Sequence, residues 1–482
     1  MSSLRTEDRR ELLDHLKQMG SRGRAEGEDA QHLPRTFHPV KEHLRMLDPD
    51  VVLIVGPRGS GKTEIFRALT DANLLEAISA EAAVPRLPAP AETTWLKGFP
   101  LGREGFDTGS LRRFIDQHQS IDAVQDLWFA YLLRSLREHI NQQDPSIEAL
   151  LGAPGGAAGD VYGAWMTSQD APLLALDRLD ERLERENRYV FVGYDELDVL
   201  GGSDWKAMAD AVRGLVAFWA AYARRWRRIR PKVFLRSDLF DRFATSGGAD
   251  LAKLAAGRVE LNWSDRQLYE MLLRRMATSD KLANYIRGGQ TKVRWREVDR
   301  LGLVPTLDRW TDARSVIERM VGPYMGANRQ KGLSYRWPLA HVRDGHDRAV
   351  PRPLVRLFEE AAGIEASSPN AVGGMRILHP ISLRKAIDRV SSEHVEHARD
   401  EWKWIDELKS RLQGILVPVE PKEVEKAIVG WPEPPPFAEP RDLLDYLIEV
   451  GILRKRSDDR IDAPDLFLYG LGLKRRGGVR RV

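Results

Sequence analysis

The sequence VVLIVGPRGSGKTEIF, residues 51–66, decides the fold. An apolar run leads into a loop that contains three glycines, a lysine and a threonine, and a helical pattern follows. Residues 56–63 match the pattern G-x-x-x-x-G-K-[ST], in which glycines let successive backbone N–H groups point into one concavity. The start of the following helix adds partial positive charge. The stretch therefore predicts a buried strand, a phosphate-binding loop and a helix.

The residue types in this loop have expected roles. The Lys62 ammonium would reach the β- and γ-phosphates of a nucleotide, and the Thr63 hydroxyl would be a ligand of Mg²⁺. The alternative is that the loop is only a glycine-rich turn. We expect the whole loop to form the nucleotide site, so the candidate binding residues are Gly56, Pro57, Arg58, Gly59, Ser60, Gly61, Lys62, Thr63 and Glu64.

A second apolar run, YVFVGYDELDVL at residues 189–200, ends in acidic residues. Such runs are typical of strands in a parallel sheet that is buried on both faces. Asp195 lies where a ligand of Mg²⁺ or of its waters is expected, and Glu196 could act as the general base for an attacking water. The alternative is that both carboxylates cap the next helix. Asp198 is a further candidate, for which the alternative is that it merely solvates the end of the strand.

A third strand is expected in KVFLRSDLF, residues 232–240. A polar residue at its end, between the phosphate loop and the acidic strand, could sense the γ-phosphate. Arg236 and Ser237 are both candidates for this sensor. The alternative for Arg236 is a purely structural ion pair with an acid such as Asp238.

Two further segments contain candidate arginines. ARRWRRIR, residues 223–230, could supply an arginine finger to a neighbouring subunit, or it could be a solvated helix end. In DRAVPRPLVRLFEEAA, residues 347–362, prolines start a helix that carries Arg352 and Arg356 one turn apart. Arg352 could reach the γ-phosphate from a lid, and the alternative is an ordinary surface arginine.

The sequence lacks the signature motifs of two other classes of phosphate-loop protein. A GTPase would carry an N-K-x-D motif that reads guanine, and the chain has none. A transporter-type ATPase would carry L-S-G-G-Q before the acidic strand, whereas the only GGQ, at 288–290, follows it. A glutamate directly after the strand acid favours hydrolysis by an activated water over phosphate transfer to a small acceptor.

Five segments carry a resemblance to a known family: GPRGSGKT, VFVGYDELD, VFLRSD, ELNWSDRQLYEMLLRRM and VPRPLVRLFEEAA. Over roughly residues 35–365, the chain resembles bacterial P-loop ATPases at the border of the AAA+ and STAND groups. The resemblance implies an ASCE-type parallel sheet with a helical lid, ATP as the nucleotide, and assembly governed by the nucleotide. It also implies roles in phosphate, metal, water and sensor contacts for Lys62, Thr63, Asp195, Glu196, Arg236 or Ser237, and Arg352.

The sequence departs from the AAA+ pattern in three places, one of which is that no clean motif surrounds the lid arginine, Arg352. The stretch between Thr63 and Asp195 is long, which predicts an insertion at about 80–170 that contains a helical hairpin. The first sensor position holds no asparagine. The approach segment LPRTFHPVKEHLRML would border the adenine in such ATPases, which makes Phe37, His38 and Val40 candidates, although the segment could equally be a tether.

The chain is expected to divide into four segments. These are an N-terminal helix and linker at 1–47, a P-loop ATPase core at 48–262, a helical lid at 263–365, and a helical and winged-helix C-terminal domain at 366–482. In the last segment, a helix should end at Gly451, and two short strands should follow around Ser-Asp-Asp. The fold class is thus α/β, with a parallel sheet, a helical insertion, a helical lid and a winged-helix-like α+β domain.

The C-terminal domain carries basic residues that could bind phosphates of a nucleic acid. The alternatives are a protein-contact module and a solvated basic tail, and the lack of interleaved aromatic residues speaks against stacking on single strands. The candidates are Arg454, Lys455, Arg456, Lys474, Arg475, Arg476, Arg480 and Arg481.

The composition sets limits on the class of protein. The chain has 482 residues, no cysteine and a formal net charge of +3, which excludes disulfides and thiolate metal sites and is too weak to indicate nucleic-acid binding by the whole chain. No apolar run is long enough to span a membrane, and the charged N-terminus lacks the apolar core of a secretion signal. We therefore expect a cytoplasmic protein with no membrane partner.

Two functions are weighed for this sequence. One is a Mg²⁺-dependent ATPase that drives or resets an assembly, forms a homo-oligomer and works with a protein effector, which in similar ATPases often belongs to bacterial antiphage defence. The other is a nucleotide-gated STAND-type switch or scaffold with little turnover. A third, weaker alternative is an ATP-dependent DNA-binding regulator.

Overall fold

The computed structural model describes most of the chain as two compact units. Residues Pro39–Leu261 form one, here called the sheet unit, and residues 1–38 together with Asn262–Val482 form the other, here called the helical unit. The described residues are 3–20, 33–82, 87–98, 107–140, 144–197, 200, 205–246, 254–255, 257–369, 372–399, 402–431 and 439–477. The predictions on Asp198, Arg480 and Arg481 lie outside them.

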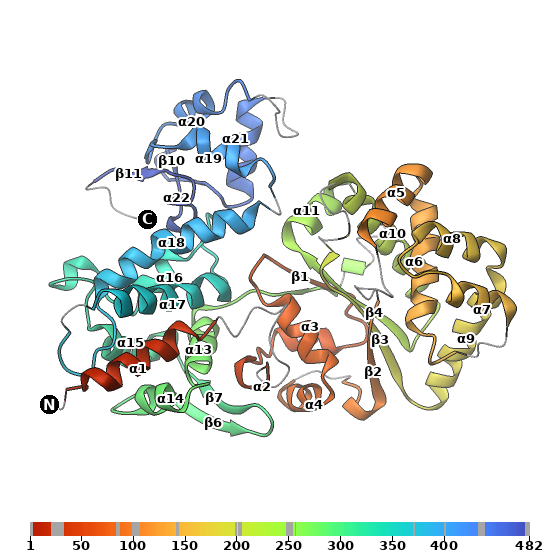
Figure 1. The fold of residues 1–482 in the computed structure, drawn as a ribbon, viewed down its shortest axis with the longest axis horizontal. Coiled ribbons are helices and arrows are strands. Elements are labelled where there is room, and N and C mark those ends of the chain that lie inside the picture. Colours follow the sequence, from red (N-terminus) through yellow and green to blue (C-terminus); the bar gives the residue numbers. More distant parts are fainter. Residues whose placement is uncertain are drawn as a thin grey trace. The chain divides into compact units, whose positions relative to one another are not determined.

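Five parallel strands form the sheet unit's central sheet, in the order β2-β3-β4-β1-β5 (Figure 1). Strand β4 lies between β1, which leads into the glycine loop, and β3, which ends in the acidic residues. This order confirms the predicted α/β fold with a parallel sheet. The strands are β1 (Leu53–Gly56), β2 (Thr93–Lys97), β3 (Tyr189–Tyr194), β4 (Ile229–Arg236) and β5 (Val259–Glu260).

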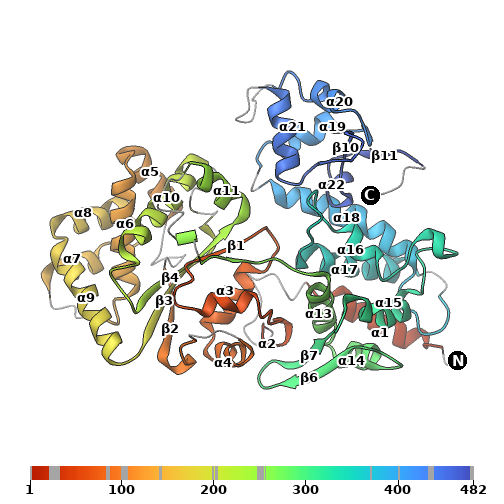
Figure 2. The same ribbon diagram turned by 180° about the vertical axis from the view of Figure 1, so that it is seen from behind.

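Helices cover both faces of this sheet. On one face, Val55 and Val192 belong to an apolar core that includes α6 and α10. On the other face, Phe66 of α3 contacts Phe234 of β4 edge-on, with ring centroids 5.5 Å apart. Figures 1 and 2 show α3 and α4 on the side of the sheet opposite α10. Burial on both faces explains why the strands read as continuous apolar runs. These helices are α3 (Lys62–Thr70), α4 (Ala72–Glu81), α6 (Ile121–Ser135) and α10 (Trp205–Tyr222).

The predicted insertion at about 80–170 contains one element that the sequence did not reveal. Residues Thr93–Lys97 form β2, which pairs in parallel with β3 at the edge of the sheet. Its side chains are only partly buried, so no apolar run marks the strand. The predicted helical hairpin corresponds to α5 and α6. The helices between β2 and β3, besides α6, are α5 (Thr108–His118), α7 (Pro145–Gly152), α8 (Ala158–Thr167) and α9 (Asp170–Arg185).

Two cations, one fully buried and one half-buried, hold the segment that leads into β1. The Lys232 side chain is fully buried in β4, and its Nζ donates to the carbonyl oxygens of Asp48 and Val51, each at 2.6 Å. The Arg230 guanidinium donates from Nε to the Pro49 carbonyl at 2.9 Å. Burial lowers the pKa of Lys232 well below its usual value, and the neighbouring Arg230 acts in the same direction. These bonds fix the backbone immediately before the glycine loop.

The helical unit contains the segment predicted as a lid. Its helix α1 packs on α14 and α17, and its β6 and β7 form an antiparallel hairpin. The segment predicted as a helical lid thus also contains this hairpin, which the sequence did not reveal because its half-exposed strands carry no apolar run. The elements of the helical unit up to residue 398 are α1 (Thr6–Lys17), α2 (Leu33–Thr36), α13 (Asp265–Met276), α14 (Asp280–Arg287), β6 (Arg294–Val298), β7 (Gly302–Thr306), η4 (Trp310–Ala313), α15 (Arg314–Val321), η5 (Arg329–Lys331), α16 (Trp337–His341), α17 (Pro351–Ser367) and α18 (Pro380–Ala398).

The last part of the chain alternates short helices and strands. Helix α21 ends just before Gly451, whose φ of 79° suits glycine, and β9 and β10 form the predicted antiparallel hairpin. Both of these predicted elements are confirmed, whereas the winged-helix assignment stays a prediction. The elements are α19 (Ile405–Leu412), β8 (Leu416–Val417), α20 (Pro421–Ala427), α21 (Pro440–Glu449), β9 (Arg454–Lys455), β10 (Ile461–Asp462), α22 (Asp465–Leu468) and β11 (Lys474–Arg475).

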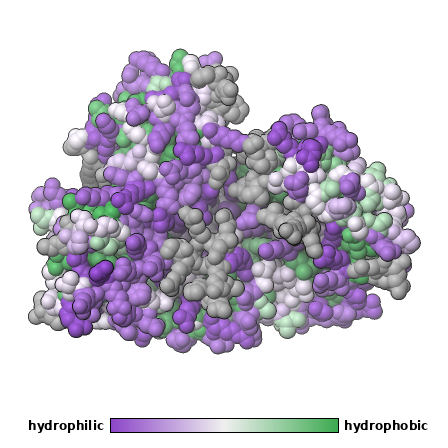
Figure 3. All heavy atoms as spheres, in the orientation of Figure 1, coloured by the Kyte–Doolittle hydropathy of each residue, from purple (hydrophilic) through white to green (hydrophobic). Residues whose placement is uncertain are grey.

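Within the described residues, no helix combines the length and the apolar character needed to cross a membrane. The face drawn in Figure 3 is mostly hydrophilic, and its hydrophobic side chains are scattered.

Candidate nucleotide site

The backbone of the glycine loop adopts conformations that only glycine takes readily. The φ angles of Gly59 and Gly61 are 80° and 98°. A Cβ atom added to Gly56 would come 2.5 Å from Ser60 Oγ and 2.9 Å from Leu261 Cβ. The loop therefore curls tightly: a side chain at Gly56 would clash with Ser60 and Leu261, and a side chain at Gly59 or Gly61 would strain the backbone.

The start of α3 has no side-chain cap. Its N-cap residue is Gly61, which has no side chain to accept a hydrogen bond from the first turn. The first N–H groups of a helix have no partner within the helix, and together with the helix dipole they favour an anion. This end of α3 can thus receive a phosphate.

Lys62 lies over the loop that it follows. Its Nζ donates to the carbonyl oxygens of Gly56 at 2.7 Å and Pro57 at 3.1 Å. The ammonium is therefore held beside the loop's concavity, and a small rotation of this flexible side chain would bring it to a phosphate.

The acidic residues stand at the same edge of the sheet as the loop. Parallel strands end together, and Gly56 is the register partner of Arg236 on β4, which in turn pairs with β3. Asp195 directly follows β3 and is 9% exposed. Glu196 is half-buried and has a φ of 57°, which is an uncommon conformation for a residue with a side chain. Such conformations cluster at functional sites.

The donor set fits a magnesium ion. Hard cations such as Mg²⁺ prefer oxygen ligands, usually one or two protein groups together with phosphates and waters. The Thr63 hydroxyl stands in the first turn of α3, and the Asp195 carboxylate at the end of β3, so both belong to this edge of the sheet. No cluster of three or more His, Asp or Glu side chains suited to a metal occurs among the described residues. A hydroxyl and a carboxylate at one sheet edge suit a metal that is shared with phosphates.

The two sensor candidates differ in their surroundings. Arg236 is 5% exposed, and its guanidinium forms a two-pronged ion pair with Asp238, with Nε–Oδ1 at 3.0 Å and Nη2–Oδ2 at 2.8 Å. The structure thus contains the ion pair that was the alternative for Arg236. Ser237 is half-buried at the start of α11 (Ser237–Ser246). Ser237 is the better-placed candidate of the two, because its hydroxyl is not part of this pair.

The arginines of the predicted lid helix have separate surroundings in the helical unit. Arg352 is exposed in the first turn of α17. The Arg356 guanidinium, by contrast, donates to the carboxylates of Glu359, Glu360 and Glu393 at 2.8–2.9 Å. Three acidic partners give Arg356 a structural role, so only Arg352 stays a candidate for contact with a nucleotide.

The segment predicted to border the adenine, residues 33–47, is anchored in the helical unit through Phe37 and His38. His38 is 8% exposed and lies 3.6 Å from Glu270 Oε2 through its Nε2. Burial lowers the pKa of His38, against the opposing effect of Glu270. The Phe37 carbonyl accepts from Nε of Arg274, which is 1% exposed and donates to three further carbonyls. Val40 is buried in the sheet unit.

The arginine-rich segment at 223–230 is mostly engaged within its own unit. Arg225 forms a two-pronged pair with Asp177 at 2.6 and 2.8 Å, and Arg228 lies 4.4 Å from the ring centre of Tyr189. The Asp180 carboxylate accepts three backbone N–H groups, from residues 227–229. These contacts anchor the start of β4, so the arginine finger in this segment stays a prediction.

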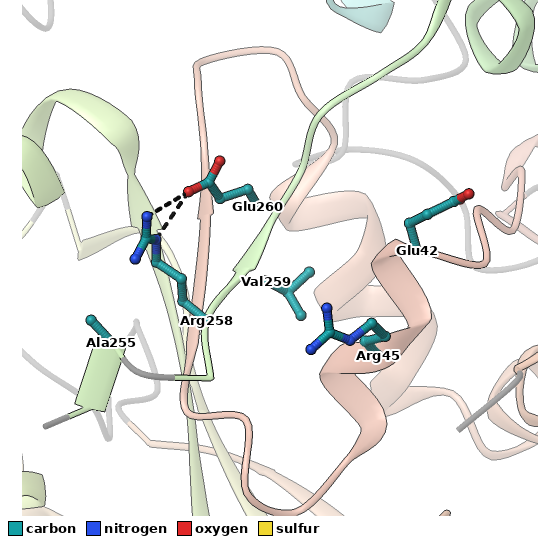
Figure 4. A pocket seen from close by; sticks show the side chains of 6 residues that line it. All are labelled: Glu42, Arg45, Ala255, Arg258, Val259 and Glu260. Atoms are coloured by element: carbon teal, nitrogen blue, oxygen red, sulfur yellow. Dashed lines mark hydrogen bonds and ion pairs between the residues drawn. The ribbon is translucent and has the colours of Figure 1, made fainter. Parts of the chain in front are cut away.

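A hollow of about 410 Å³ lies at the edge strand β5 (Figure 4). In Figure 4 the Arg258 and Glu260 side chains are joined by an ion pair, with 2.8 Å between Nη2 and Oε1. None of the phosphate-loop residues lines this hollow, so it is distinct from the nucleotide site. Its lining consists of Glu42, Arg45, Ala255, Arg258, Val259 and Glu260.

Several basic residues of the C-terminal part surround one buried carboxylate. Asp462 is fully buried, and the guanidinium groups of Arg454, Arg456 and Arg475 donate to it at 2.8–3.2 Å. Lys455 is paired with Asp459 at 2.9 Å. Lys474 and Arg476 are exposed. The predicted phosphate-binding set is thus split, and three of its arginines have a structural role.

Sequence reasoning missed the contact that spaces α3 from β3. A Cβ atom added to Gly193 would come 2.1 Å from Phe66 Cε2. A glycine inside a buried strand is the available signal, because it often marks a close approach of another element.

The sheet order, the glycine loop and the acidic strand end together are those of the P-loop nucleotide-binding fold. No protein-family model matches the sequence, and no curated protein matches it. Among solved structures, the chain is similar to the Walker-type ATPase PABY2304 of Pyrococcus abyssi, with 12% identity, 89% of this chain and 94% of that chain covered, and a TM-score of 0.40.

Two further solved structures are similar over most of the chain. The ORC2 protein of Aeropyrum pernix, in ADPNP–ADP complexes, shares 12% identity over 98% of this chain and 96% of that chain, with a TM-score of 0.30. Cdc6p of Pyrobaculum aerophilum shares 13% identity over 87% and 86%, with a TM-score of 0.32. The assignment of the fold rests on the sheet order and on the glycine loop.

Proposed function

We propose that this chain binds Mg²⁺-ATP at the loop of residues 56–63 and hydrolyses it. The observation that carries the proposal is the loop itself, in which positive φ angles at Gly59 and Gly61 curl the backbone in front of the uncapped start of α3. The same edge of the sheet offers a carboxylate for a metal and a second carboxylate for a water.

Each side chain has a distinct task in this proposal. The Lys62 ammonium, released from the two loop carbonyls, would neutralise the β- and γ-phosphates. Thr63 and Asp195 would hold Mg²⁺, which when bound supplies further charge neutralisation. The Glu196 carboxylate would orient a water in line with the γ-phosphate and accept its proton. Ser237 would donate to the γ-phosphate from β4's end.

Finer proposals rest on the resemblance of the sequence motifs. We propose that the nucleotide governs assembly of a homo-oligomer, that a protein effector acts beside it, and that Arg352 contacts the nucleotide. A role in antiphage defence and a cytoplasmic location belong to the same group of proposals. The alternative, a nucleotide-gated switch, would bind ATP at the same loop and would differ from the ATPase only in hydrolysing it little.

The decisive experiment is isothermal calorimetry of the full chain with Mg²⁺-ATP, together with a turnover assay. Wild-type protein should bind and hydrolyse ATP, and Lys62→Ala should weaken both. The matched control is Lys206→Ala, because this lysine is exposed on α10 and forms an ion pair with Asp210 one turn further along the same helix. Binding without turnover would favour the switch, and the absence of heat on addition of ATP would refute the site.

A further inference from the structure

The positive charge of the chain is concentrated in one segment of the helical unit. Residues 287–336 contain eleven Lys and Arg against five Asp and Glu, whereas the whole chain has a net charge of only +3. The rest of the chain is therefore slightly acidic. A local excess of this size attracts polyanions even when the whole protein is nearly neutral.

Three of these cations share one hollow. A cavity of about 480 Å³ is lined by Lys292, Arg294 and Arg309, which come from the start and the end of the β6–β7 hairpin. The other lining residues are Thr291, Val293, Asp308 and Asp312. The lining of the hollow therefore carries a net positive charge, and several of its side chains are exposed to solvent.

The two carboxylates in the hollow are already engaged. Asp308 is paired with Arg294. Asp312 is 6% exposed and accepts the backbone N–H of Arg309 at 2.8 Å, so it caps the turn of η4. Lys292 and Arg309 are exposed, and neither forms an ion pair with any residue that the structure describes. Their charges are therefore available to an external anion.

Aromatic rings extend this surface beyond the hollow. The Arg336 guanidinium lies 5.8 Å from the ring centre of Trp310 and 5.6 Å from that of Tyr335, and the Arg314 guanidinium lies 5.5 Å from the Tyr335 ring. Contact with a ring orients a guanidinium without neutralising it, whereas Arg314 is also paired with Glu318, with 2.7 Å between Nε and Oε1. Arg336 is exposed and, in the described part of the chain, has no ion pair.

We propose that this face binds the phosphate backbone of a nucleic-acid duplex. It is formed by Lys292, Arg309 and Arg336, together with Arg294 and Arg314, which are paired with Asp308 and Glu318. Guanidinium groups match phosphate geometry, and a two-stranded antiparallel ribbon fits the major groove of a duplex. Figures 1 and 2 show the β6–β7 ribbon extending away from α14. Arg294 and Arg296, two residues apart on β6, face the same side of the ribbon.

Two observations favour this proposal. One speaks against a single-stranded partner, and the other speaks against the C-terminal basic residues as the binding site. A single strand needs open rings for base stacking, whereas Tyr335 is 5% exposed and Trp310 lies against Arg336. The basic residues near the C-terminus offer less charge, because Arg454, Arg456 and Arg475 surround Asp462. The proposal is independent of ATP hydrolysis.

The test is fluorescence anisotropy of a labelled DNA duplex with the full chain, without nucleotide, at several salt concentrations. Wild-type protein should bind at low salt. The double variant Lys292→Gln/Arg309→Gln should bind at least tenfold more weakly, and the slope of log affinity against log salt should fall by roughly two. The matched control is Arg178→Gln/Arg185→Gln, which removes two exposed charges from α9 of the sheet unit. A second variant, Lys474→Gln/Arg476→Gln, removes the exposed charges of the C-terminal part.

Loss of affinity confined to the Lys292/Arg309 variant supports the proposal. Equal losses in the control would mean that only net charge matters, and a loss confined to the Lys474/Arg476 variant would move the site to the C-terminal part. The proposal would also be overturned if the wild-type protein did not bind the duplex, or if it bound a single strand of the same sequence more tightly. Thermal melting of each variant confirms that the fold is intact.

Discussion

Phe66 and Gly193 lie so close together that no side chain fits at position 193. The distance from an added Cβ atom to Phe66 Cε2 would be 2.1 Å. Phe66 stands one turn after Lys62 on α3, and Gly193 stands two residues before Asp195 on β3. The absence of a side chain at Gly193 therefore sets the spacing between the helix of the phosphate loop and the strand of the acidic residues.

The variant Gly193→Ala should be less stable and bind ATP more weakly. The Phe66 ring is held edge-on against Phe234, so α3 has to shift to make room for the new methyl group. Overpacking of this kind costs about 1–3 kcal/mol in the free energy of unfolding. Denaturant unfolding and calorimetry with Mg²⁺-ATP would measure the two effects.

The control for this variant is Gly163→Ala on α8, where an added Cβ atom would meet no atom within 4 Å. Alanine in a helix interior is favoured over glycine by about 1 kcal/mol, so the control should be as stable as the wild type or slightly more stable. If Gly193→Ala unfolds and binds ATP as the wild type does, the close approach does not control the site.

The variant Glu196→Gln should keep ATP binding and lose turnover. The amide keeps the size and the backbone conformation of the residue, whose φ is 57°, but it cannot accept a proton from the attacking water. Loss of a general base typically lowers the rate about 10²–10⁴-fold. Single-turnover kinetics of the full chain would measure it, with Glu181→Gln on the exposed side of α9 as the control. Undiminished turnover in Glu196→Gln would exclude this residue as the base.

The sequence predicted the centre of the sheet well and its edge poorly. Strands β1, β3 and β4 are buried on both faces, so each leaves a continuous apolar run in the sequence. The strand at Thr93–Lys97 is only half-buried, and its partner at Tyr189 lies far along the chain. The β6–β7 hairpin was missed for the same reason. Local patterns reveal burial, whereas pairing at an edge depends on the folded chain.

For the candidate functional residues too, the sequence predicted some contacts and not others. The roles proposed for the loop followed from the spacing of Gly56, Gly61 and Lys62, because the motif is contiguous. The pair between Arg236 and Asp238 was foreseen as an alternative, since the two residues are neighbours in the sequence. The convergence of three arginines on Asp462 was not foreseen, because charges in a sequence do not show which of them meet.

Ser237 and Arg236 should respond differently to substitution. Ser237→Ala should change the free energy of unfolding by less than about 0.5 kcal/mol but lower ATP turnover, since the hydroxyl is proposed to contact the γ-phosphate. Arg236→Gln should lower stability by about 3 kcal/mol, because it leaves the Asp238 carboxylate without its buried partner. Unfolding and turnover measured on both variants separate the roles. Normal turnover in Ser237→Ala would remove it as the sensor.

Asp462 should make the stability of the helical unit depend on pH in the acid range. Burial alone would raise the pKa of this carboxyl, but Arg475 and Arg454 outweigh burial and hold the pKa below its usual value. A depressed pKa means that the native state binds its proton less readily than the unfolded state. The stabilisation is therefore complete above the unfolded pKa of about 3.9 and is lost as pH falls through the lower folded value.

The variant Asp462→Asn should remove this part of the pH dependence and lower stability at neutral pH. Three guanidinium groups would face a neutral amide, and the loss of one partner from a buried ion pair costs about 3–5 kcal/mol. Asp445→Asn is the matched control, because Asp445 is 68% exposed on α21. Denaturant unfolding from about pH 3 to pH 7 would compare them around the aspartate pKa. Equal stability of the two variants across this range would show that the arginines around position 462 do not depend on its charge.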